Sequence, residues 1–147
     1  MKPQFHGKNL RRGRVSQPGR IYALTLVTKN RIRVFADFPA ARKAVHGFYD
    51  ARVRKRAKTL AFVVMPDHVH WLMELETGGT LSEAVRMYRA EVSLALGYPI
   101  WQKGFYDRAL RSDEDIVKVA RYIIANPVRA GIVRHVGDYP HWDAVWL

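Results

Sequence analysis

The sequence predicts an α+β fold with helices packed on a mainly antiparallel sheet, close to a ferredoxin-like β-α-β-β-α-β sandwich with an added C-terminal helix. Segments with strand and helix patterns follow one another in the order strand, helix, two strands, helix, strand and helix. The chain of 147 residues is 48% hydrophobic, which is enough for one core. Because we find no repeat, linker or low-complexity tract, we expect a single domain over residues 1–147.

The first half of the sequence predicts one helix between strands. Residues 1–20 contain few large apolar side chains and predict a basic arm or a tightly turned loop. Residues 22–28 alternate and are rich in β-forming side chains, which indicates the first strand. The proline that opens residues 39–58 favours a helix start. Residues 60–65 predict a buried strand, and residues 68–76 predict the next strand after a Pro-Asp turn.

The second half begins with a capped helix. Thr80 and Glu83 form a capping box, which predicts a second helix that ends near residue 96. Residues 100–110 mix aromatic and charged side chains and predict a strand with an irregularity at Gly104.

A third helix is predicted from Ser112, which would cap it, to about Asn126. Four polar side chains recur every four residues and would form one stripe along this helix: Glu114, Lys118, Tyr122 and Asn126. Tyr122 is either a half-buried amphipathic side chain or a functional group, and Asn126 before a proline is commonly just a residue that ends a helix.

The charges are concentrated in one part of the chain. Residues 1–60 hold 16 Lys and Arg against 2 acidic residues, a net charge of +14, whereas residues 61–147 hold 9 against 11, a net charge of −2. This asymmetry predicts a polyanionic partner that is bound through its phosphates. The candidates in the arm for contacts with phosphates or guanine bases are Arg11, Arg12, Arg14 and Arg20.

Composition excludes several classes of protein. The chain has no Cys, which excludes disulfide scaffolds, thiolate metal sites and cysteine nucleophiles. No apolar run approaches the roughly 20 residues of a membrane helix, and no apolar segment follows the basic N-terminus. We therefore expect a cytoplasmic protein with no membrane partner, and the polyanionic partner predicted from the charges would place it at the nucleoid.

His68 and His70 stand two apart in a predicted strand, so their side chains share one face with backbone positions about 6.6 Å apart. Two imidazoles in this arrangement can converge on one metal ion. The alternative is a pair of ordinary histidines, one packed and one solvated.

Three blocks of the sequence resemble a known family. Residues 62–72 (FVVMPDHVHWL) are similar to the His-hydrophobe-His motif of the IS200-like tyrosine transposases. Residues 101–107 (WQKGFYD) and 121–131 (RYIIANPVRAG) are similar to later blocks of one branch, the REP-associated tyrosine transposases. The resemblance covers nearly the whole chain.

The resemblance implies a metal-dependent endonuclease and strand transferase that acts on single-stranded and hairpin DNA through a 5′-phosphotyrosine. It implies that Tyr122 is the nucleophile and that His68, His70 and Asn126 bind Mg²⁺ or Mn²⁺, while Zn²⁺ stays open on ligand type alone. Lys118, one turn before Tyr122, is a candidate to favour the phenolate. We leave open a monomer or homodimer, and an active site formed within one chain or between two.

Two alternatives remain at this stage. The first is a non-catalytic, domesticated DNA- or RNA-binding module of ferredoxin-like fold. The second is a metal phosphoesterase whose nucleophile is water. Asp67, where many relatives have Asn, is a departure from the family pattern to which the sequence assigns no role.

Overall fold

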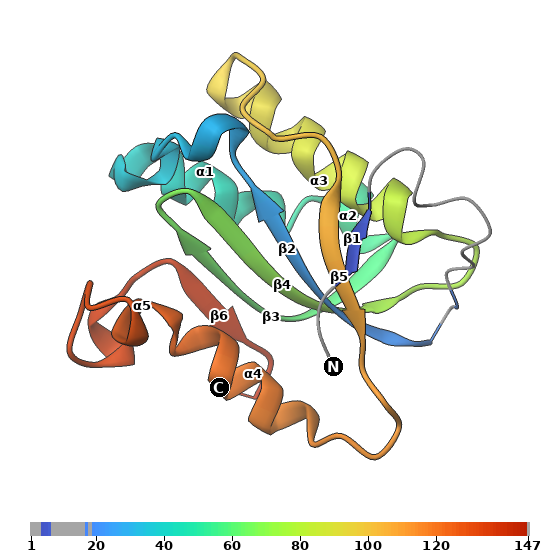
Figure 1. Ribbon diagram of the computed structural model, residues 1–147. Coiled ribbons are helices and arrows are strands. Elements are labelled where there is room, and N and C mark those ends of the chain that lie inside the picture. Colours follow the sequence, from blue (N-terminus) through green and yellow to red (C-terminus); the bar gives the residue numbers. More distant parts are fainter. Residues whose placement is uncertain (1–3, 7–16, 18, 147) are drawn as a thin grey trace.

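The structure is a computed structural model, and it describes residues 4–6, 17 and 19–146. Six strands form one sheet in the order β1-β5-β2-β4-β3-β6, and every neighbouring pair is antiparallel (Figure 1). The strands are β1 (Gln4–His6), β2 (Ile21–Val27), β3 (Ala57–Met65), β4 (His68–Leu75), β5 (Phe105–Ala109) and β6 (Trp142–Ala144). The four central strands with their crossover helices confirm the expected ferredoxin-like plan. The two edge strands, β1 and β6, were not predicted.

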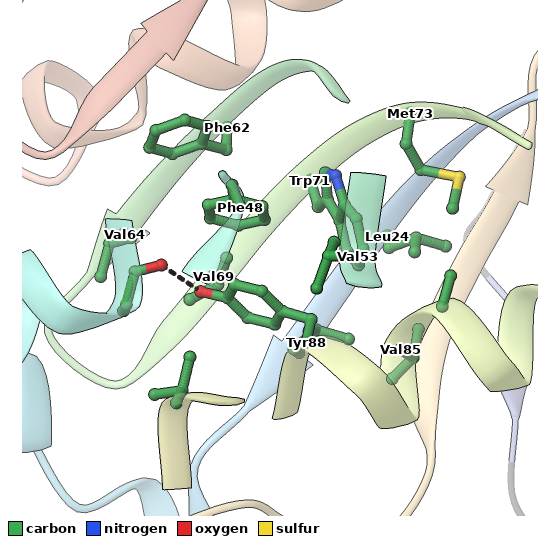
Figure 2. Packing of buried hydrophobic residues seen from close by; sticks show 14 of the residues in the cluster. Leu24, Phe48, Val53, Phe62, Val64, Val69, Trp71, Met73, Val85 and Tyr88 are labelled. Atoms are coloured by element: carbon green, nitrogen blue, oxygen red, sulfur yellow. Dashed lines mark hydrogen bonds between the residues drawn. The ribbon is translucent and has the colours of Figure 1, made fainter. Parts of the chain in front are cut away.

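Three helices cover one face of the sheet: α1 (Phe38–Gly47), α2 (Ala51–Arg54) and α3 (Leu81–Leu96). Figure 2 shows the core beneath them, in which the rings of Phe48 and Tyr88 stack with centroids 4.2 Å apart. Trp71 is fully buried beside them. The Tyr88 hydroxyl donates to the carbonyl of Ala44 at 2.9 Å, so its polar group is satisfied inside the core.

The opposite face carries α4 (Ile116–Ile124) and α5 (Asn126–Arg129) (Figure 1). A second apolar cluster lies there and joins Leu72 of β4 and Val63 of β3 to Ile123 of α4. Because side chains alternate along β4, Val69 and Trp71 enter the first core, whereas His68 and His70 lie on the face that carries α4. The strand alternation predicted from the sequence is therefore confirmed.

The predicted helix over residues 39–58 is wrong in its second half. Helix α1 ends at Gly47, and the separate short helix α2 begins after Asp50, whose carboxylate accepts a hydrogen bond from the Arg52 amide at 2.9 Å. The chain is already extended at Ala57, which pairs with Leu75 of β4. Pairing with the end of β4 has overridden the helical pattern of the sequence.

The predicted start of the third helix is also wrong. Asp115, not Ser112, caps α4 by accepting from the Lys118 amide at 3.1 Å. Glu114 lies before the helix, where it accepts two hydrogen bonds from Arg108 at 2.7 and 2.9 Å. The expected polar stripe therefore loses its first member, and its last member, Asn126, lies beyond the end of α4 at the start of the separate helix α5.

Other local predictions are confirmed. Thr80 caps α3 by accepting from the Glu83 amide at 3.1 Å. Gly104, with a φ of 76°, interrupts the predicted fourth strand, so that β5 begins only at the next residue while Trp101 forms a single bridge to Thr28. Over the part of the chain that the structure describes, none of the helices is both long and apolar enough to span a membrane.

Candidate functional site

The histidine pair lies at the start of β4. His70 is in register with Thr25 of β2 and Val63 of β3, so it occupies the middle of the sheet. The imidazole rings of His68 and His70 have centroids 4.8 Å apart and are nearly perpendicular, at 85°. The sequence-predicted convergence of these two side chains on one face is thus present in the fold.

Each imidazole is held through its Nδ1 atom. The Nδ1 of His68 lies 2.7 Å from a carboxylate oxygen of Asp67, and the Nδ1 of His70 lies 3.2 Å from the hydroxyl of Thr25. Both contacts leave Nε2 as the nitrogen available for another partner. Metal-binding histidines are commonly oriented in this way, by a hydrogen bond at the nitrogen that does not bind the ion.

Asp67 is fixed on both its main chain and its side chain. Its carbonyl accepts from the amide and the hydroxyl of Thr28, each at 3.0 Å, and Arg31 lies 3.4 Å from its carboxylate. Burial alone would raise the pKa of Asp67, but the hydrogen bond and charge of His68, together with Arg31, lower the pKa below its usual value. Sequence reasoning assigned this residue no role; its position directly before the first histidine was the available signal.

His70 is held in its neutral form. Burial is the largest cause that lowers its pKa from 6.5 to about 3, and the positive charges of His68, Arg129 and Arg31 act in the same direction. Only the neutral ring can donate a lone pair to a cation, so His70 is ready to act as a ligand at physiological pH. The same surrounding charges would also attract a phosphate.

Tyr122 lies on the solvent side of α4, and 66% of its surface is exposed. The helix buries Ala120 and Ile123 against the sheet, which turns Tyr122 outward. The guanidinium carbon of Arg129 lies 3.7 Å from the centre of the Tyr122 ring. Lys118, which the sequence suggested as the neighbouring cation, is exposed one turn away, and the cation in contact with the ring is Arg129.

Arg129 acts on groups of two different elements. It stacks on the Tyr122 ring from α5, and its charge also lowers the pKa of His70 on β4. Sequence reasoning missed this arginine, although it lies in the Asn-Pro-Val-Arg block that follows the tyrosine. The arrangement places a phenol, a guanidinium and two imidazoles on one side of the molecule.

Asn126 begins α5 and is half-buried, one turn after Tyr122 along the chain. Within the described ranges the side-chain amide of Asn126 forms no hydrogen bond. Among the same residues, no group of three or more His, Cys, Asp or Glu side chains could hold a metal ion. A complete shell would therefore need ligands of another kind, such as an amide oxygen, a phosphate or water. The role of Asn126 stays a prediction.

The arm is described only in part. Arg11, Arg12 and Arg14 lie outside the described residues. Arg20 is exposed, and its guanidinium donates to the side-chain oxygen of Gln17 at 2.8 Å. Its main-chain carbonyl accepts a hydrogen bond from the amide of Leu75, the last residue of β4. It therefore lies at the end of β4 opposite to the histidine pair.

Comparisons with known proteins identify the family of the chain. The family described as IS200-like transposases matches residues 17–126. A REP-associated tyrosine transposase of Escherichia coli K12 is 35% identical over 82 residues, which cover 54% of this chain and 50% of that protein. A Haemophilus influenzae Rd protein provisionally named a REP-associated tyrosine transposase is 26% identical over 145 residues, covering 84% of this chain and 78% of that protein.

A solved structure of a REP-associated tyrosine transposase bound to a REP hairpin matches with a TM-score of 0.71 and 27% identity, over 88% of this chain and 79% of that one. The family match covers well over half of the chain, and the similar relatives and the solved structure all fall in the same branch. The chain therefore belongs to the IS200-like transposase family and, within it, to the REP-associated tyrosine transposases.

Proposed function

We propose that this protein binds a REP-type DNA hairpin, cleaves the single strand beside it and rejoins the strand through a covalent bond to Tyr122. One observation carries the proposal: the guanidinium of Arg129 contacts the Tyr122 ring, and the charge of the same residue is among the causes that lower the pKa of His70. The solved relative, whose partner is a REP hairpin, supports the choice of substrate. The surplus of cations in residues 1–60 suits a phosphate-rich ligand.

The donor set fits a divalent cation such as Mn²⁺ or Mg²⁺. His68 and His70 would bind it through Nε2, because Asp67 and Thr25 occupy their Nδ1 atoms. Asn126 would add an amide oxygen, and two imidazoles with one amide leave positions for phosphate and water. When bound, the ion would act as a Lewis acid on a non-bridging phosphate oxygen.

The proposed covalent step balances as follows. The hydroxyl oxygen of Tyr122 attacks the phosphorus, and its proton passes to solvent. A bond forms between that oxygen and phosphorus, while the bond from phosphorus to the 3′ oxygen breaks, so the strand is left with a free 3′ hydroxyl and a 5′-phosphotyrosine. The energy of the phosphodiester is kept in this link, so that rejoining requires no nucleotide cofactor.

Arg129 has two roles in this proposal. Its guanidinium packs on the Tyr122 ring, which restricts an otherwise exposed side chain. The same group would offer its remaining N–H donors to the phosphate oxygens that gain charge as Tyr122 attacks. Both roles follow from the contact of the guanidinium with the Tyr122 ring.

The site is proposed to form within one chain. Within one chain, Arg129 contacts the Tyr122 ring and its charge lowers the pKa of His70, which supports completion in cis. Mixing inactive His68→Ala with inactive Tyr122→Phe tests this, because a site shared between two chains would regain activity in the mixture. Recovery of cleavage would contradict the cis arrangement and leave the chemistry intact.

A covalent-adduct assay tests the function itself. A hairpin oligonucleotide with a single-stranded flank is labelled at its 3′ end, because the proposed link retains that fragment, and is incubated with the protein and Mn²⁺. We expect a labelled band that survives SDS with the wild type and with Tyr98→Phe, an exposed tyrosine outside the site, but not with Tyr122→Phe. Cleavage without an adduct would indicate a water nucleophile, and binding without cleavage would indicate a non-catalytic module.

A further inference from the structure

A large cavity lies away from the histidine pair. It has a volume of about 560 Å³ and lies at the edge of the sheet, between the end of α1, the start of β3 and β6. Aromatic side chains, Tyr49 and Phe62 among them, line one part of it, and the cations Arg54 and Lys58 line another. This volume is in the range of small-molecule sites in proteins.

The cavity is separate from the proposed catalytic site. Lys58 is in register with Glu74, whereas His70 is in register with Val63, so about 17 Å of strand β3 lies between the two positions. None of the residues that line the cavity belongs to the histidine pair, α4 or α5. A ligand in the cavity would therefore not occupy the site of cleavage.

The surroundings of the cavity are strongly basic. Five of the seven residues from 52 to 58 are Lys or Arg, while Val53 and Ala57 hold this segment in the core. Arg52 is paired with Asp50 and Glu91. Over the described part of the chain, three exposed cations of this segment take part in no ion pair: Arg54, Lys55 and Lys58.

Two acids also line the cavity, and one of them is already engaged. The hydroxyl of Tyr49 donates to the carboxylate of Asp143 at 2.5 Å, which fixes the ring at the cavity wall; the other acid is Glu76. Tyr49 is 52% exposed, so one part of its ring is open to a ligand. The cavity thus combines an oriented aromatic surface with free cations, which is the combination that binds single-stranded nucleic acid.

We propose that this cavity binds an unpaired nucleotide of the DNA substrate, with the base against Tyr49 and the adjoining phosphates on Arg54 and Lys58. The proposal rests on DNA being the substrate of this protein. Double-stranded stem cannot enter a cavity of this size, whereas a single unstacked base can. Arg20 lies at the same end of the sheet, so the strand would be held there at a distance from His70.

Photo-crosslinking locates the base. A thymidine hexanucleotide that carries 5-iododeoxyuridine is irradiated with the Tyr122→Phe protein in the absence of divalent ions, and the crosslinked peptide is identified by mass spectrometry. We expect crosslinking at Tyr49. Crosslinking confined to aromatic residues outside the cavity would overturn the proposal.

Binding measurements give a second, independent readout. For the same hexanucleotide we expect Arg54→Ala/Lys58→Ala to raise Kd at least tenfold and to reduce the slope of log Kd against log salt by about 1.4. The control Lys43→Ala/Arg134→Ala removes the same charge from exposed positions elsewhere and should raise Kd less than threefold. An equal loss of affinity in both double variants would show that the cations attract DNA only through the overall charge, and it would overturn the proposed site.

A third variant tests the ring. Tyr49→Leu should weaken binding of the hexanucleotide about fivefold or more, because stacking contributes roughly 1–3 kcal/mol per base. Thermal denaturation checks that the variant is folded, and unchanged binding by a folded variant would refute stacking on Tyr49. None of these assays requires cleavage of DNA. The proposed binding site in the cavity and the proposed covalent chemistry at Tyr122 are therefore tested independently of each other.

Discussion

Replacing Asp67 with alanine tests how the histidine pair is oriented for the proposed metal ion. The carboxylate of Asp67 lies 2.7 Å from the Nδ1 of His68, and the two side chains are 26% and 17% exposed. The substitution removes this contact but leaves the main-chain carbonyl, which Thr28 binds twice. The ring of His68 would then lose its orientation while the turn that carries it stays in place.

The size of the effect follows from the type of bond. Removing a hydrogen-bond partner of a metal-binding histidine lowers metal affinity by about 10- to 100-fold. Charge-assisted hydrogen bonds are roughly twice as strong as neutral ones, so Asp67→Asn, which keeps an oxygen acceptor, should lower the affinity by only about 3- to 10-fold. We therefore expect the order wild type, Asp67→Asn, Asp67→Ala in decreasing affinity for Mn²⁺.

Electron paramagnetic resonance of free Mn²⁺ measures this affinity without DNA or catalysis. Asp138→Ala removes one exposed negative charge and is the matched control, for which the affinity should change less than twofold. His68→Ala should lose binding. If Asp67→Ala binds Mn²⁺ within twofold of the wild type while His68→Ala does not bind, Asp67 is not a positioning residue and the reasoning is wrong.

Three further predictions concern the site and its support. Arg129→Met should slow formation of the Tyr122 adduct about 10- to 100-fold with unchanged Mn²⁺ affinity, and Arg129→Lys should recover part of the rate in a single-turnover assay. The pKa of His70 is about 3 in the folded protein and 6.5 in the unfolded chain, so only the unfolded chain takes up this proton as the pH falls from 8 to 5. Urea denaturation of the metal-free protein should therefore give a free energy of unfolding about 2 kcal/mol lower at pH 5 than at pH 8. The variant His70→Gln should reduce this pH dependence. Gly47→Ala should destabilise the fold by about 1–2 kcal/mol in the same assay despite a better helix propensity, because the added Cβ would lie 2.9 Å from the ring of Tyr88.

The central fold was predictable because its signals are local. Alternation in residues 22–28 and around His70 fixed both the strands and the face on which the histidines lie. The edge strands were not predictable, because β1 and β6 are each three residues long and exist only through pairing with β5 and β3. The helix over residues 39–58 failed for the same reason, since pairing of Ala57 with β4 is a long-range effect.

The candidate site shows the same difference between local signals, which the sequence reveals, and long-range contacts, which it does not. Its candidate chemical groups, His68, His70 and Tyr122, were predicted from spacing and from the resemblance to a family, and their roles stay predictions. The side chains that prepare them were not found, because Thr25 meets His70 only when β2 and β4 are in register, and Arg129 meets Tyr122 only across the junction of α4 and α5. The register of two strands that are far apart in the sequence leaves no periodic trace.

The turn between β3 and β4 links the stability of the fold to the chemistry of the site. Its residues Pro66 and Asp67 accept main-chain hydrogen bonds from Phe35 and Thr28, which tie the turn to the segment that follows β2. Register in this hairpin decides which face His68 occupies, because a slip of one residue would exchange the two faces of β4. The main chain of the turn therefore sets the position of the histidine, and the Asp67 carboxylate sets the orientation of its ring. Substitutions at Thr28 should impair folding and metal binding together, whereas Asp67→Ala should impair metal binding alone.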